Sequence, residues 1–373
     1  MSKISAPDEA GIQRRTTTKS AHQQKLVDLS IDDIAEASGV SVSTVSRILN
    51  NKPDVSDSTR QRVLSVIRKK GYVPHPHAQR LASGNTDTIA LVHPVVSGEA
   101  DDVLLDFILG ASAVTEEQRF FFNLVTRPVS KHDLQSLYRN HFIDGVILMQ
   151  ICLSDWRVDY LSKAKLPFVM IGRTADCENL PYVDLDFKRA VTTVLDHLSD
   201  LGHTKIAFLR HPSFQIEQGY GPAARQLEGY SEYVRRRGFP ELVKETNFSF
   251  GGSLAATESL LEEEPGLTAV ISASGDGMSG VVEAARRHGL RVPEDLSVAC
   301  SSCSERIATS MLPALTSVNM ESNLMGSVAA KMLIRLLKER QYVPEQRLLP
   351  PRFVVRDSTA PAGKGRDGAR RLP

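Results

Sequence analysis

The side chains best suited to recognising another molecule lie near residue 45, on the polar face of a predicted helix. Four side chains share one side of a helical pattern that runs from residue 42 to about 49: Val42, Ser43, Ser46 and Arg47. The opposite side is apolar, with Val45, Ile48 and Leu49 at core spacing. Short side chains can approach base edges closely, and an arginine can form two parallel hydrogen bonds with guanine. This pattern predicts a helix that enters the major groove of DNA.

A preceding helix is needed to hold that one in place. Ser30 is a suitable N-cap, and Asp33 follows at capping-box spacing. The next apolar positions share one helical face: Ile31, Ile34 and Ala35. Gly39 permits a sharp turn, and Ser41 can cap the second helix. The stretch therefore predicts a helix-turn-helix arrangement.

A third helix is predicted from Ser56, its N-cap, to Gly71. We expect it to pack through three side chains: Val63, Leu64 and Ile67. Its last turn, residues 68–70, is Arg-Lys-Lys, which suits both the negative end of a helix dipole and a phosphate backbone.

The charge of the chain is divided unevenly. Residues 1–84 hold 13 Lys and Arg against 8 Asp and Glu, or +5, whereas residues 85–373 hold 32 against 36, or −4. Any small helical domain has capped, amphipathic helices, so these alone do not establish DNA binding. The basic charge of the head favours it.

The stretch VSVSTVSRILNNKPDVSDSTRQRVLSVIRKKGYVPHPHAQRLASG resembles the head and hinge of the lactose-repressor (LacI/GalR) family of bacterial transcription regulators. The family pattern runs A-x-x-A-G-V-S-x-x-T-V-S-R-x-L-N, then V-S-x-x-T-R-x-x-V, then G-Y-x-P-N-x-x-A-R-x-L. The match is dense and ungapped. Ser38, His75 and Gln79 depart from it, which leaves the fold untouched and affects only individual phosphate contacts.

The resemblance implies roles for nine residues. Val42, Ser43 and Arg47 match base-reading positions. Ser30, Ser46, Asn50 and Ser56 match phosphate-facing positions, and Ala78 and Leu81 match the hinge helix. In the family this hinge folds only on the operator, where paired leucines wedge into the minor groove. A helix over residues 77–83 is too short to be stable alone in water, so its folding would be coupled to DNA binding.

After about residue 88, apolar runs such as IALVHPVV, DGVILMQ and PFVMIGR alternate with helical stretches, as in βαβ units on a parallel sheet. The rhythm restarts at KIAFLRH and continues through TAVISAS and LSVAC. Eight or more units exceed one comfortable doubly wound sheet. We therefore predict an α/β body of two doubly wound parallel-sheet lobes with a ligand cleft between them.

The resemblance extends to about residue 360 and implies a body similar to periplasmic sugar-binding proteins, with three crossings between the lobes. The expected organisation is a disordered arm at 1–28, a helix-turn-helix domain at 29–74, a hinge helix and linker at 75–86, an effector-binding and dimerisation domain at 87–358, and a disordered tail at 359–373. The first lobe would contain about 87–185 and 316–343, and the second about 186–315 and 344–358. The tail lacks the leucine heptads with which some members form tetramers, so a homodimer is expected.

Four residues are candidates for binding a sugar-type effector, whose hydroxyls need planar donors and acceptors at strand ends. Asp276 follows TAVISAS and matches a family Asp, although it could instead cap the next helix. Arg173 ends PFVMIGR and could contact hydroxyls or a carboxylate, or form a surface salt bridge. At the position of the family's effector-binding Arg stands Gln226, one place after Arg225. The family's G-F-D-D loop is Cys-Ser-Ser-Cys at 300–303, so no ligand is named.

The sequence predicts no catalytic residues, cofactor or metal site. Cys300 and Cys303 form a lone CxxC, a redox pair or half a metal site at most, and are more simply small buried residues. An apolar run long enough to span a membrane is absent, as is an N-terminal h-region, so we expect a cytoplasmic protein without a membrane partner.

The sequence therefore predicts a ligand-responsive repressor of carbohydrate or related catabolic genes. It would bind a pseudo-palindromic operator in double-stranded DNA, with a sugar or sugar derivative as effector. The alternative is a cytoplasmic small-molecule-binding protein or an enzyme on a doubly wound fold. The sequence lacks three common enzyme motifs: GxGxxG after a strand, GxxxxGK[ST] and GxSxG. Their absence weakens the hypothesis that the chain is an enzyme.

Overall fold

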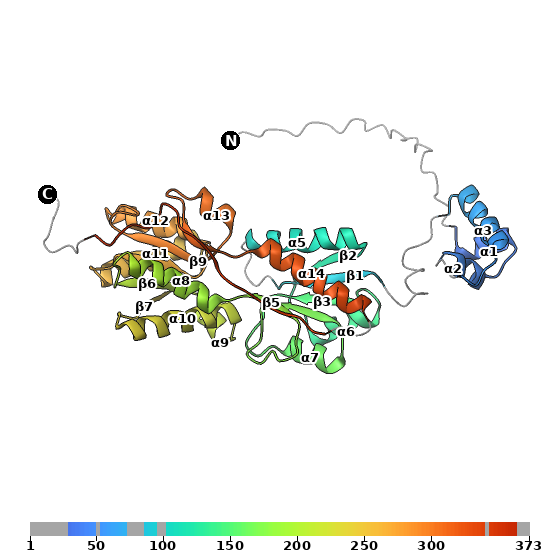
Figure 1. The fold of residues 1–373 in the computed structure, drawn as a ribbon, viewed down its shortest axis with the longest axis horizontal. Coiled ribbons are helices and arrows are strands. Elements are labelled where there is room, and N and C mark those ends of the chain that lie inside the picture. The colour runs from blue at the N-terminus through green and yellow to red at the C-terminus, as the bar shows by residue number, and fades with distance from the viewer. Residues whose placement is uncertain (1–28, 50–52, 73–85, 95–101, 340–342, 364–373) are drawn as a thin grey trace, which may run out of the picture. The chain divides into compact units, whose positions relative to one another are not determined.

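The structure of the chain is a computed structural model. It describes residues 29–49, 53–72, 86–94, 102–339 and 343–363. The chain divides into two compact units, Met1–Ser83 and Gly84–Pro373. We call the first the head and the second the body (Figure 1).

The described part of the head contains three helices, α1 (Ile31–Ser38), α2 (Val42–Leu49) and α3 (Asp57–Lys70). Their apolar faces meet in one small core: Ile34, Ala35, Val45, Ile48, Val63 and Tyr72. Leu64 is 38% exposed, so the prediction that it packs inside is wrong. Successive helical residues point about 100° apart, so Leu64 points away from the core when its neighbour Val63 faces it. Val63 and Ile67 pack in the core as predicted.

The body contains two six-stranded sheets. The first has the order β11-β5-β4-β3-β1-β2 and the second the order β12-β10-β9-β8-β6-β7. The first sheet is built from β1 (Thr88–Val92), β2 (Phe121–Val125), β3 (Gly145–Leu148), β4 (Phe168–Ile171), β5 (Tyr182–Leu185) and β11 (Gln346–Leu349). The second is built from β6 (Ile206–Arg210), β7 (Leu242–Glu245), β8 (Ala269–Ser272), β9 (Ser297–Cys303), β10 (Thr316–Asn319) and β12 (Arg352–Val354). All pairs are parallel except β10 with β12.

Helices cover both faces of each sheet (Figure 1). In the first lobe, α5 (Asp102–Gln118) and α14 (Ser322–Lys338) cover one face, and α6 (Lys131–Arg139) and α7 (Trp156–Ala164) the other. In the second lobe, α8 (Phe187–Asp200) and α10 (Gly221–Arg237) cover one face, and α11 (Phe250–Glu263), α12 (Met278–Arg287) and α13 (Glu305–Ser310) the other. A short helix, α9 (Ser213–Glu217), precedes α10.

The central strands are buried on both sides, which explains their continuous apolar sequences. In β1, Ile89 and Leu91 face the core under α5 and α14, whereas Ala90 and Val92 face the core over α7. The close approach of α5 and α14 depends on two glycines. A Cβ on Gly110 would lie 2.0 Å from the backbone oxygen of Asn323, and one on Gly326 would lie 2.2 Å from that of Phe107.

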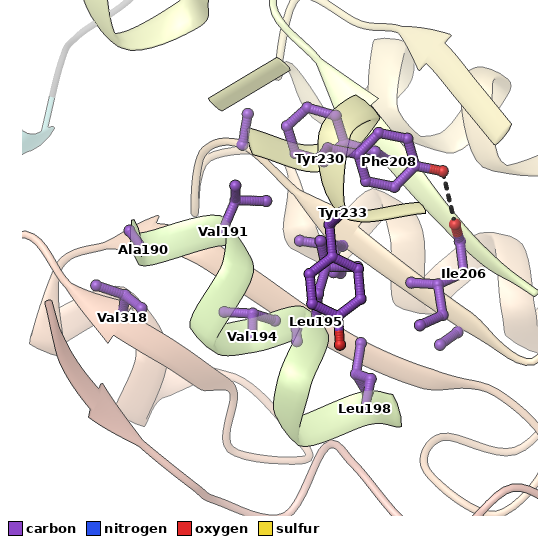
Figure 2. Close-up of a cluster of buried hydrophobic side chains, with 14 of the residues drawn as sticks. Ala190, Val191, Val194, Leu195, Leu198, Ile206, Phe208, Tyr230, Tyr233 and Val318 are labelled. Carbon is purple, nitrogen blue, oxygen red and sulfur yellow. Dashed lines mark hydrogen bonds between the residues drawn. The ribbon is translucent and has the colours of Figure 1, made fainter. Parts of the chain in front are cut away.

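Tyrosines of α10 anchor the second lobe (Figure 2). Tyr230 stacks on Phe208 with ring centroids 5.0 Å apart. Its hydroxyl donates to the backbone oxygen of Ile206 at 2.9 Å and accepts from the N–H of Leu242 at 2.9 Å. The buried hydroxyl is thus satisfied, so this large side chain joins the two neighbouring strands without a polar penalty.

The chain passes between the lobes three times, as expected, but two segments lie in the lobe opposite to the expected one. β10 belongs to the second sheet and β11 to the first. The expected boundary at 316 is wrong because the chain crosses only after β10, between β10 and α14, and it crosses again between β11 and β12. Residues 359 and 360, assigned to a disordered tail, are also bound to the second lobe: the N–H of Ala360 donates to Ser297 Oγ at 3.0 Å.

Candidate DNA-reading head and effector cleft

The helix ends in the head are held by local contacts, and the predicted caps are confirmed. The N–H of Asp33 donates to Ser30 Oγ at 3.2 Å, and the N–H of Ser30 donates to Asp33 Oδ2 at 2.7 Å. Ser41 Oγ accepts from the N–H of Thr44 at 3.2 Å. Gly39 ends α1 with φ of 66°, a left-handed conformation that costs glycine little.

The outer face of α2 remains available for contact with another molecule. Val42, Ser43 and Arg47 are exposed, and Ser46 is half-buried. The guanidinium of Arg47 lies 3.2 Å from Asp54 Oδ2, and both side chains are at least half exposed. Exposed ion pairs of this kind contribute little free energy, so Arg47 can exchange this partner for a guanine edge.

The other DNA-facing candidates divide into two groups. Ser56 caps α3 by accepting from the N–H of Thr59, and the three basic residues that end this helix are exposed. Asn50, Ala78 and Leu81 lie outside the residues that the structure describes. Their roles at phosphates and in the hinge therefore stay predictions.

A cavity of about 380 Å³ lies between the two lobes of the body and is lined by both. The first lobe contributes His93, Phe107, Gln150 and Asp184 among others, and the second contributes Gln226, Asn247, Asp276 and Ser302 among others. Many lining residues follow the carboxyl ends of parallel strands, where open α/β sheets bind ligands. We call this cavity the cleft.

Two of the four predicted effector residues, Gln226 and Asp276, line the cleft. Asp276 Oδ2 accepts from Ser274 Oγ at 3.1 Å. The N-cap position of α12 is occupied by Gly277, and no side-chain cap hydrogen bond is made there. The alternative that Asp276 is the N-cap of this helix is therefore wrong. Gln226 is 1% exposed.

The two predicted arginines are not among the lining residues of the cleft. Arg225 Nη2 donates to the backbone oxygens of Arg173 and Thr174 at 3.0 and 3.1 Å. Arg173 Nε lies 3.8 Å from Asp184 Oδ2, with both side chains mostly buried. Arg173 thus forms an ion pair, as its salt-bridge alternative expected, although the pair is mostly buried and not on the surface. Arg225 links α10 of the second lobe to the loop after β4 of the first. Roles of the two arginines in effector binding stay predictions.

Asp184 is a cleft residue that sequence reasoning missed. It lies in the buried strand β5, is 2% exposed, and lines the cavity. Burial raises the pKa of this carboxyl to about 7, against the opposing effect of Arg173 and Arg225. A carboxylate inside a strand of otherwise apolar residues was the available signal.

Aromatic rings form another part of the cleft wall. His211 lies edge-on to Tyr220 and Phe248, with ring centroids 5.6 and 4.8 Å apart. Its Nδ1 is 2.8 Å from Gln215 Oε1, and burial lowers its pKa to about 4. This imidazole is therefore neutral at physiological pH and offers hydrogen bonds and a ring face to a ligand.

The Cys-Ser-Ser-Cys segment lies at the end of β9. Cys300 and Cys303 are buried in the second-lobe core, while Ser302 lines the cleft and lies 2.7 Å from Met320 Sδ. Within the described ranges, groups of three or more His, Cys, Asp and Glu side chains suited to a metal ion are absent. The described helices also include none long and apolar enough to cross a membrane.

Comparisons with known proteins cover both units. Residues 30–75 match the model of bacterial regulatory proteins of the lacI family, and residues 195–359 match a periplasmic binding protein-like domain. The HTH-type transcriptional regulator CelR of Thermobifida fusca is 30% identical over 337 residues, which are 88% of this chain and 97% of that protein.

Two solved structures are similar over most of the chain. A CelR–cellobiose complex has 29% identity and a TM-score of 0.65, covering 88% of this chain and 99% of that one. A lac repressor dimer bound to operator and an anti-inducer has 23% identity and a TM-score of 0.76, covering 89% and 99%. The predicted fold class, a helix-turn-helix head with a two-lobed α/β body, is confirmed.

These relatives are transcription regulators, not enzymes, so the alternative of an enzyme on a doubly wound fold falls away. The chain has the head, the two-lobed body and the overall length of those regulators. It belongs to the lacI family of bacterial regulatory proteins, the DNA-binding transcription regulators that the head and hinge motifs predicted.

Proposed function

We propose that this chain is a homodimeric repressor that binds a pseudo-palindromic operator and releases or tightens its hold when a carbohydrate occupies the cleft. The observation that carries the proposal is the combination of an exposed, arginine-bearing α2 face with a cavity shared by two lobes. A regulator that binds chromosomal DNA acts in the cytoplasm of a bacterium.

Operator binding is supported by the chemistry of α2. Val42, Ser43 and Arg47 face solvent while the apolar side of the helix is fixed in the head core. A rigid helix with short residues at its start and an arginine one turn later suits base reading in the major groove. Ser30, Ser46 and Ser56 present hydroxyls that suit phosphate contacts.

A carbohydrate effector is supported by the lining of the cleft. The lining includes neutral polar side chains such as Gln150, Asn247 and Ser302 together with aromatic rings. Hydroxyls need paired donors and acceptors when they are desolvated, and sugar rings pack against aromatic faces. The similar CelR structure is a complex with cellobiose, which makes β-glucosides a reasonable first group to test.

Homodimer formation is supported by apolar side chains on the first lobe. Leu105 and Leu109 on α5 are 54% and 51% exposed, and Phe121 and Leu124 on the neighbouring edge strand β2 are 55% and 43% exposed. Apolar groups gathered in this way commonly mark interfaces. The similar lac repressor structure is a dimer on its operator. Leu109→Glu should yield monomers in light scattering, whereas Leu312→Glu, at an 88% exposed site in the second lobe, should not.

Ligand closure of the two lobes would alter the separation of the paired heads and so change operator affinity. The coupling expected for such a two-state device is about 1–3 kcal/mol per site. Because either lobe arrangement could suit the operator, the sign of the response is to be measured.

Gel-shift titration of the purified protein against its own upstream DNA tests the proposal. We expect tight binding to one site, a steep loss of affinity as salt concentration rises, and a change on adding cellobiose or another sugar. Equal affinity for unrelated sequences would contradict operator recognition. Tight operator binding that no sugar alters would contradict only the effector part.

A further inference from the structure

The titratable side chains that line the cleft bear on the charge that its ligand can carry. Asp184 and Asp276 each contribute a carboxyl group to the lining. Among the described residues that line the cleft there is no Lys or Arg. His211 does not supply the missing positive charge near neutral pH, because burial lowers its pKa to about 4. The lining thus holds two carboxyl groups and two histidines, His93 and His211, beside neutral polar side chains.

Two buried oxygens on these walls have no hydrogen-bond partner. They are Oδ2 of Asp184 and Oε1 of Gln226, from side chains that are 2% and 1% exposed. An unsatisfied buried acceptor costs free energy, which a ligand recovers if it brings a donor. Oε1 of Gln226 accepts and cannot donate, and the same holds for Oδ2 of Asp184 when the carboxyl is ionised, so a ligand that brings O–H or N–H groups gains hydrogen bonds at this place.

Two arginines lie near Asp184 but are not lining residues of the cleft. Arg225 Nη2 donates to the backbone oxygens of Arg173 and Thr174, and Arg225 Nη1 is buried without a hydrogen-bond partner. Arg173 Nε lies 3.8 Å from Asp184 Oδ2. The arginines stabilise the ionised form of Asp184, although burial still raises the pKa of this carboxyl to about 7.

A ligand carboxylate or phosphate beside Asp184 would meet a second negative charge and an acceptor without a donor. Like-charge contact in a desolvated site costs several kcal/mol, whereas hydroxyls and protonated amines gain hydrogen bonds there. Asp184 therefore acts as a filter on the charge of the ligand.

We propose that Asp184 determines the charge class of the effector: the cleft binds an uncharged or amine-bearing polyhydroxylated ring and rejects the acid and phosphate forms of the same ring. This inference rests on the proposed carbohydrate response and adds the substrate class. It assigns the specificity to a β5 carboxyl and the adjoining Gln226, neither of which contacts DNA.

Calorimetry and thermal shift with the full-length protein test the inference. The probes are glucose, galactose, mannose and cellobiose, together with the 2-amino, uronic acid and 6-phosphate forms of each hexose. At about pH 7.5, where most Asp184 is ionised, neutral and amino forms should bind at least about tenfold tighter than the acid and phosphate forms of the same hexose. Tighter binding of an acid or phosphate form would overturn the inference and leave a carbohydrate-responsive repressor intact.

Asp184→Asn sharpens the test because it removes the charge and keeps the shape. It should weaken the amino form and bring the acid form to within about threefold of the neutral one. Asp200→Asn makes the same charge change at the exposed end of α8 and should leave the ranking unchanged. An unchanged ranking in Asp184→Asn would overturn the role of Asp184. If that variant does not fold, the ranking in the unaltered protein still decides the charge class. If none of the probes binds, the carbohydrate response fails, and this inference with it.

Discussion

The head and the cleft hold their functional side chains in different ways. In the head, one continuous stretch supplies the candidates, and Val42, Ser43 and Arg47 face solvent with few partners. In the cleft, Asp184 and Gln226 come from different lobes and are buried. The difference teaches that recognition and stability are separable in the head and coupled in the cleft. Substitutions of buried residues that line the cleft should thus change folding and ligand response together, and substitutions on the outer face of α2 should change DNA binding alone.

Gly110→Ala should have the largest effect, because its Cβ would lie 2.0 Å from the backbone oxygen of Asn323. Forcing α5 and α14 apart should cost about 4 kcal/mol of body stability in denaturant unfolding. Ligand affinity should fall as well, since Phe107, one turn earlier, lines the cleft. Gly251→Ala is the matched control: nothing lies within 4 Å of its Cβ in α11, so its stability should not fall. Equal effects of the two would contradict the coupling.

Asp184→Asn should change how body stability depends on pH. The pKa of this carboxyl is about 7 in the folded protein and 3.8 in a model compound, so folding favours the protonated form. Its contribution is fully present below about pH 4 and is lost as the pH rises through about 7. Unfolding free energy of the unaltered protein, measured relative to the variant, should therefore fall by roughly 3–4 kcal/mol between about pH 4 and pH 8. Parallel pH profiles would show that Asp184 is not buried as described.

Arg47→Ala tests the head side of the comparison. It should weaken binding to the cognate operator by about 1–3 kcal/mol and relax base preference in gel shifts. Unfolding free energy should change by less than about 0.5 kcal/mol, because the pair with Asp54 is exposed. A uniform loss on all DNA sequences would instead make Arg47 a phosphate contact.

Ser30→Ala should have the smallest effect, a loss of about 1 kcal/mol in head stability as α1 loses its cap. Amide exchange of the first turn of α1 would detect it, with the body as an internal reference. Ser30→Thr should restore head stability in the absence of DNA, because its hydroxyl can also accept from the N–H of Asp33.

The sequence predicted the head well because its determinants are local. Each cap joins residues three apart, so spacing alone revealed Ser30, Ser41 and Ser56. Leu64 was the exception, since a neighbouring position on α3 fits the core better. Asn50, Ala78 and Leu81 lie outside the described residues, and their roles stay predictions.

The cleft was predicted only in part because its determinants are remote in sequence. The position of Asp276 at the end of a strand was enough to predict that it lines the cleft. The sequence does not show that Arg173 faces Asp184, or that Arg225 donates to backbone oxygens. A strand buried on both faces carries no alternation that would show where Asp184 points. The lobe of β10 was misassigned for a similar reason, because the crossing point depends on pairing with β9, more than ten residues away.

The three passages between the lobes bear on synthesis of the chain. The second lobe is nearly continuous from α8 to β10, and only the short edge strand β12 arrives later. The first lobe begins earlier yet lacks α14 and β11 until residues 322–349 have been made. On the ribosome, the part made later in the body can therefore close its sheet first, while an apolar face beside α5 stays uncovered and in need of protection.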